Sequence, residues 1–296
     1  MGKELDDQQV LWIDTGLDAQ ELEQVDEALG LNRVVRSVMD TSGVGLRFVD
    51  GAIRLTVAGL EAHQKAGRPS PVLVHIVAAP NAVVSVHDRA VLGLEDLVAA
   101  AAGDPRFGRL DAGTFVGLLL DGMMNGYYRE LEDIERGLDK IDERALGREP
   151  TDALLSELVS ARHRLAILRR TLAPQREVYA ALARATDNKS SPIGAPWPEL
   201  ITRLERTIDA VDHVRDSVLG SFDIVMTRTG QRTNDIMRVL TVISSVLLPA
   251  VVVGGVMGMN FHPSFFDDPS FFFIVVAAMV ALAALTLLFA RHRGWL

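Results

Sequence analysis

Apolar positions are concentrated at the C-terminal end of the chain, in two runs at residues 239–257 and 271–290 that contain no charged residue. Each run approaches the ~20 apolar residues that an α-helix needs to cross the hydrocarbon core of a bilayer. A helix also satisfies its own backbone polar groups where no water can reach them. We therefore predict two transmembrane helices. The alternative, a pair of buried helices in a soluble protein, is disfavoured because two such runs lie side by side.

Basic residues flank this pair of runs on one side only. The intervening segment 258–270 has no Lys or Arg but carries Asp267 and Asp268. Because basic residues remain on the cytoplasmic side of a membrane, the N-terminal part and the C-terminal tail are predicted to be cytoplasmic and the segment between the runs to face outward. The basic residues are Arg228, Arg232, Arg238, Arg291 and Arg293, with His292 beside the last two.

The N-terminal third alternates between short β-rich runs and helical patterns. Residues 10–14 form a short apolar run that predicts a strand. Two β-rich stretches surround Asp50-Gly51, a strong hairpin-turn pair, and two more surround Pro80-Asn81. Helical spacing follows at 94–102. We expect an α/β domain over residues 1–105.

Residues 106–196 predict a helical hairpin. A helix over 111–146 is rich in carboxylates, and a second helix over 151–185 is rich in arginine. The opposite charges favour antiparallel pairing. Alternatively, the two charged faces are simply exposed to solvent and do not drive pairing, since exposed ion pairs contribute only about 0–1 kcal/mol each.

A third helix begins near Glu199 and meets no proline until Pro249, so it runs from a cytoplasmic stalk into the first apolar run and covers 197–260. Such length without interior caps is typical of a coiled coil or a membrane span. One face, traced in steps of four and three, is polar or small where packing against apolar neighbours would favour aliphatic residues. Its members are Asp223, Thr227, Gly230, Asn234, Met237, Thr241, Ser244, Leu248, Val251 and Gly255. We interpret this stripe as a pore wall built from several copies of the helix. The alternative is ordinary packing of membrane helices through small and hydroxyl residues.

The tripeptide Gly258-Met259-Asn260 stands at the outer end of the first apolar run. An apolar helix that ends in GMN, followed by a short loop and a closing apolar helix, resembles the CorA family of divalent-cation channels. The stretch at 173–182 and the closing GWL also resemble the zinc-transporting ZntB branch. The resemblance implies a funnel-shaped homopentamer in the inner (plasma) membrane, multi-pass, with both termini cytoplasmic. It places the helical hairpin in the outer part of the funnel, an outer loop at 261–270, and the second transmembrane helix with its basic tail at 271–296.

The resemblance makes Gly258, Met259 and Asn260 the selectivity filter. Magnesium releases its six waters reluctantly. A ring of Asn260 carbonyls would therefore accept hydrogen bonds from the hydration water. Asp267 and Asp268 would attract cations at the mouth, where they replace the Glu of the family's Met-Pro-Glu-Leu stretch, which this chain lacks.

Further candidate ion contacts lie on the cytoplasmic side. Met237 and Leu248 would form apolar constrictions that gate by dewetting. Asp223 would form a carboxylate ring that binds a regulatory internal cation, unless it faces outward and pairs with an arginine. Metal sites between subunits are also predicted at Glu95, Asp96 and Glu199.

Composition excludes several functions. The chain has no cysteine, so it has no disulfide, thiolate metal site or cysteine nucleophile. Its net charge of -9 argues against nucleic-acid binding. No catalytic motif is present, and we predict neither an enzyme nor a cofactor. His75 and His87 lie on the two arms of the second predicted hairpin; with Asp88 they would make a metal site, but ordinary strand histidines are favoured.

Three functions remain. The first is passive uptake of magnesium, with cobalt or nickel as further substrates, and the intact GMN favours it. The second is ZntB-type zinc transport, including a proton-coupled form, which the 173–182 stretch favours. The third is a membrane-anchored cation sensor or scaffold. In each case the predicted partners are further copies of the chain, the lipid bilayer and divalent cations, which are the transported and regulatory ions.

Overall fold

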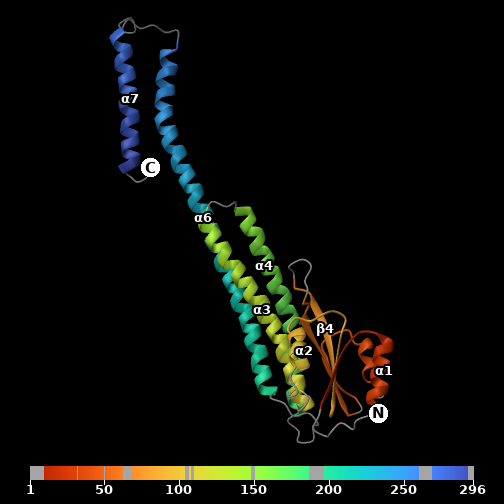
Figure 1. Cartoon of the computed structure of the whole chain (residues 1–296). Coiled ribbons are helices and arrows are strands. Elements are labelled where there is room, and N and C mark those ends of the chain that lie inside the picture. Colours follow the sequence, from red (N-terminus) through yellow and green to blue (C-terminus); the bar gives the residue numbers. More distant parts are fainter. Residues whose placement is uncertain are drawn as a thin grey trace. The chain divides into compact units, whose positions relative to one another are not determined.

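The computed structural model describes residues 10–31, 33–49, 51–62, 69–103, 107, 110–147, 151–186, 197–259 and 269–292 (Figure 1). The chain divides into two compact units, Met1–Phe222 and Asp223–Leu296. The strands are β1 (Leu11–Gly16), β2 (Gly45–Val49), β3 (Ala52–Leu60), β4 (Pro71–Ala79) and β5 (Ala82–His87). The helices are α1 (Ala19–Leu29), the 3₁₀ helix η1 (Arg36–Asp40), α2 (Leu94–Gly103), α3 (Ala112–Leu146), α4 (Thr151–Leu172), α5 (Gln175–Thr186), α6 (Trp197–Met257) and α7 (Pro269–His292).

The first unit contains a five-stranded mixed sheet in the order β1-β5-β4-β3-β2. Both predicted hairpins are confirmed, because β2 pairs with β3 and β4 pairs with β5 in antiparallel registers. At the first turn Gly51 has a φ of 80°, a conformation that glycine adopts without steric cost. Strand β1 lies at one edge of the sheet, parallel to β5.

One face of the sheet is covered by α1 and η1, which lie on the opposite side from α2, α3 and α4 (Figure 1). The carboxylate of Asp18 caps α1 by accepting hydrogen bonds from the backbone N–H groups of Gln20 and Glu21, at 2.9 and 3.1 Å. The apolar core on this side combines residues of α1, of the segment leading into η1 and of three strands. It includes Leu22, Val34, Val35, Val38, Val77, Val84 and Val86.

The other face of the sheet packs against α3 and α5. The Tyr127 hydroxyl of α3 donates to the Ala58 carbonyl of β3 at 2.8 Å, and the Gln175 amide of α5 donates to the same carbonyl at 3.0 Å. Phe115 of α3 stacks at a tilt on Trp12, with ring centroids 5.1 Å apart. Strand β3 is therefore buried on both faces along its whole length.

The prediction of a single helix over 151–185 is wrong, because this segment forms two helices, α4 and α5. The break falls at Pro174, which has no backbone N–H to donate and disfavours the α conformation in the residue before it. Beyond the break, the buried side chain of Gln175 bonds to β3 and also to the Thr171 carbonyl at 3.1 Å. The break thus turns α5 onto the sheet.

Helices α3 and α4 form the predicted antiparallel, charge-matched pair. Arg164 bonds Glu130 at 2.8 Å and Asp133 at 2.6 Å, and farther along Arg144 bonds Glu157 at 2.7 and 2.9 Å. Most of these carboxylates are exposed, so the pairs specify register more than they add stability. Burial of an apolar seam supplies the larger contribution. The seam includes Leu131, Ile134, Leu138, Ile141, Leu154, Leu158 and Leu165.

The second unit contains the last part of α6 and all of α7. Each of these helices has a stretch that is long and apolar enough to cross a membrane, and almost none of either stretch is buried inside the chain. Most of the large apolar side chains of both stretches are exposed, as expected of surfaces that meet lipid or other copies of the chain.

Candidate ion pathway

In the second unit, one face of α6 packs toward α7. A groove of about 460 Å³ lies between the two helices and is wholly apolar in its side chains. On the α6 side it is lined by Val246, Leu247, Pro249, Ala250 and Val253, and on the α7 side by Ile274, Val275, Ala278, Met279, Val280, Leu282 and Ala283.

The predicted stripe lies on the other side of α6. At about 100° per residue, Ser244, Leu248, Val251 and Gly255 are centred about 180° from the residues that face α7. All ten predicted stripe residues are exposed in the single chain. Val251, for example, is 67% exposed, although it lies within an apolar span. The stripe is therefore free to face a pore or another copy of the chain.

The stripe offers neutral oxygen acceptors inside the apolar run. The Thr241 hydroxyl donates its hydrogen to the Met237 carbonyl at 2.7 Å, which leaves the oxygen lone pairs available. Acceptors of this kind suit the outward-pointing hydrogens of a hydrated cation.

Helix α6 ends immediately before the predicted filter. The N–H of Gly258 donates to the Gly254 carbonyl at 3.0 Å, and that of Met259 donates to the Val256 carbonyl at 3.3 Å. A Cβ added to Gly258 would lie 3.3 Å from the Gly254 oxygen, a tight contact that glycine avoids. Asn260, Asp267 and Asp268 lie outside the described residues, so their predicted roles stay predictions.

Asp223 is exposed, and no Lys or Arg of the described residues forms an ion pair with it. The predicted stripe begins at this residue. Continuing the same seven-residue step toward the N-terminus reaches Asp216 and Asp209, both exposed and both on α6. Asp216 lies 3.5 Å from Arg215, and Asp209 has no ion pair among the described residues. The spacing alone could have revealed this run of carboxylates.

The three other predicted metal ligands lie on different helices. Glu95 and Asp96 are in the first turn of α2, where Asp96 forms an ion pair with Arg129 at 2.5 Å. Glu199 is in the first turn of α6. No group of three or more His, Asp or Glu side chains placed to hold a metal occurs in the described parts of the chain. A site at these residues would need ligands from a second copy.

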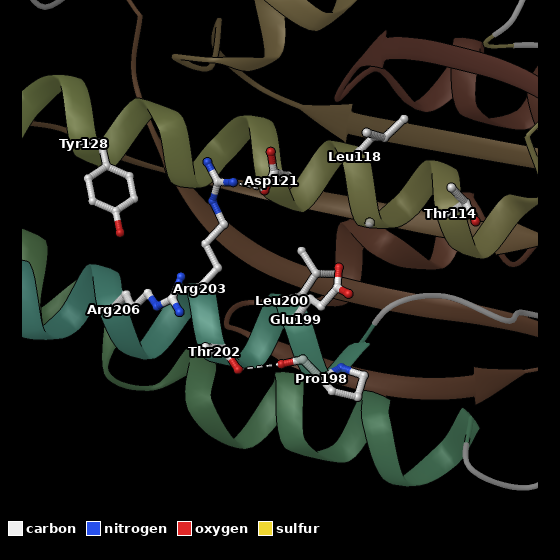
Figure 2. Close-up of a pocket in the computed structure, with 11 residues that line it drawn as sticks. Thr114, Leu118, Asp121, Tyr128, Pro198, Glu199, Leu200, Thr202, Arg203 and Arg206 are labelled. Carbon is white, nitrogen blue, oxygen red and sulfur yellow. Dashed lines mark hydrogen bonds and ion pairs between the residues drawn. The ribbon is translucent and has the colours of Figure 1, made fainter.

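Glu199 lines a cavity of about 750 Å³ between α3 and α6. Figure 2 shows Arg203 reaching from α6 to Asp121 of α3, where the two side chains pair at 2.7 Å. Arg206 and Tyr128 line the same space. The cavity is therefore mixed in charge and does not concentrate carboxylates.

His75 and His87 do not form a metal site. The β4–β5 register places His75 opposite Val86 and His87 opposite Val74, so the two imidazoles project from opposite faces of the sheet. His75 is buried with its Nδ1 3.0 Å from the Thr56 hydroxyl, and burial lowers its pKa. His87 lies 3.1 Å from Asp14, and this hydrogen bond raises its pKa. The expectation of ordinary strand histidines is confirmed.

The family model described as "CorA-like Mg2+ transporter protein" matches residues 7–292, which is nearly the whole chain. The chain belongs to the CorA family. This family consists of transporters, which confirms the prediction that the chain is not an enzyme.

Relatives within the CorA family differ in the ion they are named for. The chain is 26% identical to the cobalt/magnesium transport protein CorA of Thermotoga maritima over 182 residues, which cover 60% of this chain and 51% of that protein. It is 22% identical to the zinc transport protein ZntB of Yersinia enterocolitica over 262 residues, covering 84% and 76%. The match thus spans about half the length of the Thermotoga relative.

The complete structure of the CorA magnesium transporter from Methanocaldococcus jannaschii matches with a TM-score of 0.76 at 19% identity, covering 99% of this chain and 94% of that one. This similarity confirms the predicted fold: an α/β domain, a long helix and two C-terminal membrane helices.

Proposed function

We propose that the protein is a CorA-type divalent-cation channel that carries magnesium, and also cobalt or nickel, through a pore lined by several copies of α6. The assembly is a homopentamer in the inner (plasma) membrane, with the N- and C-termini in the cytoplasm. Membrane potential drives uptake.

One observation carries this proposal: α6 has two unlike faces in its apolar part. The side that packs toward α7 is aliphatic, whereas the opposite side, which remains exposed, includes Thr241, Ser244 and Gly255 beside Leu248 and Val251. Small and hydroxyl residues can also serve ordinary packing of membrane helices, but a water-filled axis would in addition hydrate the exposed hydroxyls of Ser244 and Thr241.

The proposed filter recognises a cation that keeps its hydration water. Residues 239–257 contain no charge, so α6 offers the ion only neutral oxygens along the span. Magnesium would keep its waters, and the Asn260 carbonyls would accept their hydrogens at the outer end beside Gly258 and Met259. Asp267 and Asp268 would raise the local cation concentration, an effect that salt screens over about 8 Å.

The gate would be formed by apolar stripe residues and regulated by the carboxylate below them. Met237 and Leu248 are 61% and 66% exposed, so rings of either could dewet a narrow pore. A ring of Asp223 carboxylates is electrostatically costly unless a cation occupies it. Internal magnesium bound there would hold the subunits together with the pore closed.

Zinc transport is the second candidate, favoured by the ZntB relative and the 173–182 stretch. Within that stretch Gln175 and Tyr179 are buried, and Gln175 ties α5 to β3. The resemblance there thus concerns packing, which does not choose an ion. Zinc also prefers nitrogen and sulfur ligands, whereas the stripe offers mainly oxygen. These arguments favour magnesium.

Flux into proteoliposomes tests the proposal. Purified protein is reconstituted and uptake of Mg²⁺, Co²⁺, Ni²⁺ and Zn²⁺ is measured with and without a membrane potential and a pH gradient. We expect potential-driven Mg²⁺ uptake that Asn260→Ala abolishes while the assembled mass stays unchanged. Zn²⁺ uptake that follows the pH gradient would support the ZntB-type alternative. No flux of any metal would contradict both and favour the membrane-anchored sensor.

A further inference from the structure

Strand β3 carries a buried arginine on the face covered by α1 and η1. Arg54 is only 6% exposed, and its Nη1 donates to the Ser37 carbonyl at 2.9 Å and to the Ser37 hydroxyl at 2.5 Å. Both acceptors are neutral, and no ion pair joins Arg54 to a carboxylate of the described residues. An arginine with so little exposed surface and no ion-paired carboxylate is well placed to bind an anion.

A second arginine faces the same space. In the β2–β3 register Arg47 is the direct cross-strand partner of Arg54, and like charges in this position destabilise a sheet. Burial lowers the pKa of Arg54, and the positive charge of Arg47 lowers it further; Asp40 opposes both effects. One carboxylate against two guanidinium groups leaves the positive charge in excess.

A polar cavity of about 330 Å³ opens beside these two arginines. Its wall is made by the end of η1, the loop that follows it, and strands β2 and β3. Neither Gly43 nor Gly45 has a neighbouring atom within 4 Å of an added Cβ, so the loop leaves open space. The lining residues are Asp40, Thr41, Ser42, Gly43, Val44, Gly45, Leu46, Arg47, Arg54 and Thr56.

We propose that this cavity binds a phosphate-class oxyanion, either free phosphate or the phosphoryl group of a small metabolite. Guanidinium groups bind such oxygens in a bidentate manner, and the Thr41 and Ser42 hydroxyls supply further donors. The oxyanion offsets the repulsion between Arg47 and Arg54, which the single carboxylate of Asp40 balances only in part. The site lies in the first unit, so it does not depend on how α6 conducts ions.

Isothermal titration of the full-length protein in detergent with inorganic phosphate, at constant ionic strength, tests this site. We expect saturable binding of one phosphate per chain and no heat of binding from chloride. Arg47→Gln, at an exposed position, should weaken binding at least tenfold without loss of folding. The matched control Arg136→Gln, an exposed arginine of α3 that is 3.7 Å from Asp133, should bind phosphate like the wild type.

Adenosine monophosphate is titrated in parallel to distinguish the two sources of the oxyanion. Tighter binding than phosphate supports a phosphorylated metabolite, and equal or weaker binding supports the free ion. If the Arg54→Met variant folds, it should not bind phosphate. If it does not fold, the phosphate affinity of Arg47→Gln tests the proposal. An absence of saturable phosphate binding, or equal affinity in the wild type and Arg47→Gln, would overturn the proposal.

Discussion

Substitution of two glycines of α3 by alanine separates the effect of helix propensity on stability from the effect of packing. A Cβ on Gly126 would lie 2.5 Å from the Leu92 carbonyl oxygen, whereas Gly137, on the same helix, has no atom within 4 Å of the added carbon. Alanine gains about 1 kcal/mol over glycine within a helix at either position. Only Gly126→Ala must also push the loop before α2 away, and overpacking costs about 1–3 kcal/mol. Because both variants gain the same helix propensity, the difference in their free energies of unfolding reports the packing cost at Gly126 alone.

The comparison is made by thermal unfolding of both purified variants in the same detergent. A free-energy difference of 1 kcal/mol shifts the midpoint by about 2–4 °C for a domain of 150–250 residues. We therefore expect Gly126→Ala to unfold about 2–12 °C below Gly137→Ala, with Gly137→Ala at or above the wild type. Equal midpoints would refute the close packing of the Leu92 loop on α3.

Two further predictions concern charge. Asp223→Asn should leave the assembly intact but weaken the inhibition of flux by internal magnesium; superimposable inhibition curves for variant and wild type would eliminate the carboxylate ring. The hydrogen bond to Asp14 raises the pKa of His87 above its ordinary 6.5, so the stability from this pair is fully present below pH 6.5 and is lost as the pH rises through the raised value. The midpoint difference between wild type and His87→Gln should therefore be larger at pH 5.5 than at pH 8.5, and a constant difference would contradict the pairing.

Local signals predicted most of the fold. The turn pair Asp50-Gly51 and the pair Pro80-Asn81 each punctuate β-rich runs, so both hairpins could be read without tertiary information. Complementary charge predicted the α3–α4 pairing. Pro174 is a local signal for the break between α4 and α5, because a proline inside a helical pattern removes a hydrogen-bond donor and breaks the helix.

The Arg54 cavity could be predicted only in part. A two-residue turn at 50–51 sets Arg47 opposite Arg54, so the cross-strand pair follows from the sequence. The burial of Arg54 does not, because an arginine in a strand is normally placed on a solvated face. It is buried here because η1, which precedes β2 in the chain, closes over that face of the sheet and presents Ser37 to Arg54. Such burial depends on tertiary packing that no local pattern encodes.

The central claim is that the stripe of α6 lines the ion pathway. The chain has no native cysteine, so single cysteines can be introduced into a background that does not react with thiol reagents. Ser244→Cys lies on the stripe, and Val253→Cys lies on the side that packs toward α7. The measurement is Mg²⁺ flux through each variant before and after a charged, membrane-impermeant methanethiosulfonate. We predict block of Ser244→Cys with magnesium protection and no block of Val253→Cys; unaffected flux in Ser244→Cys, or equal block of both, would contradict the account.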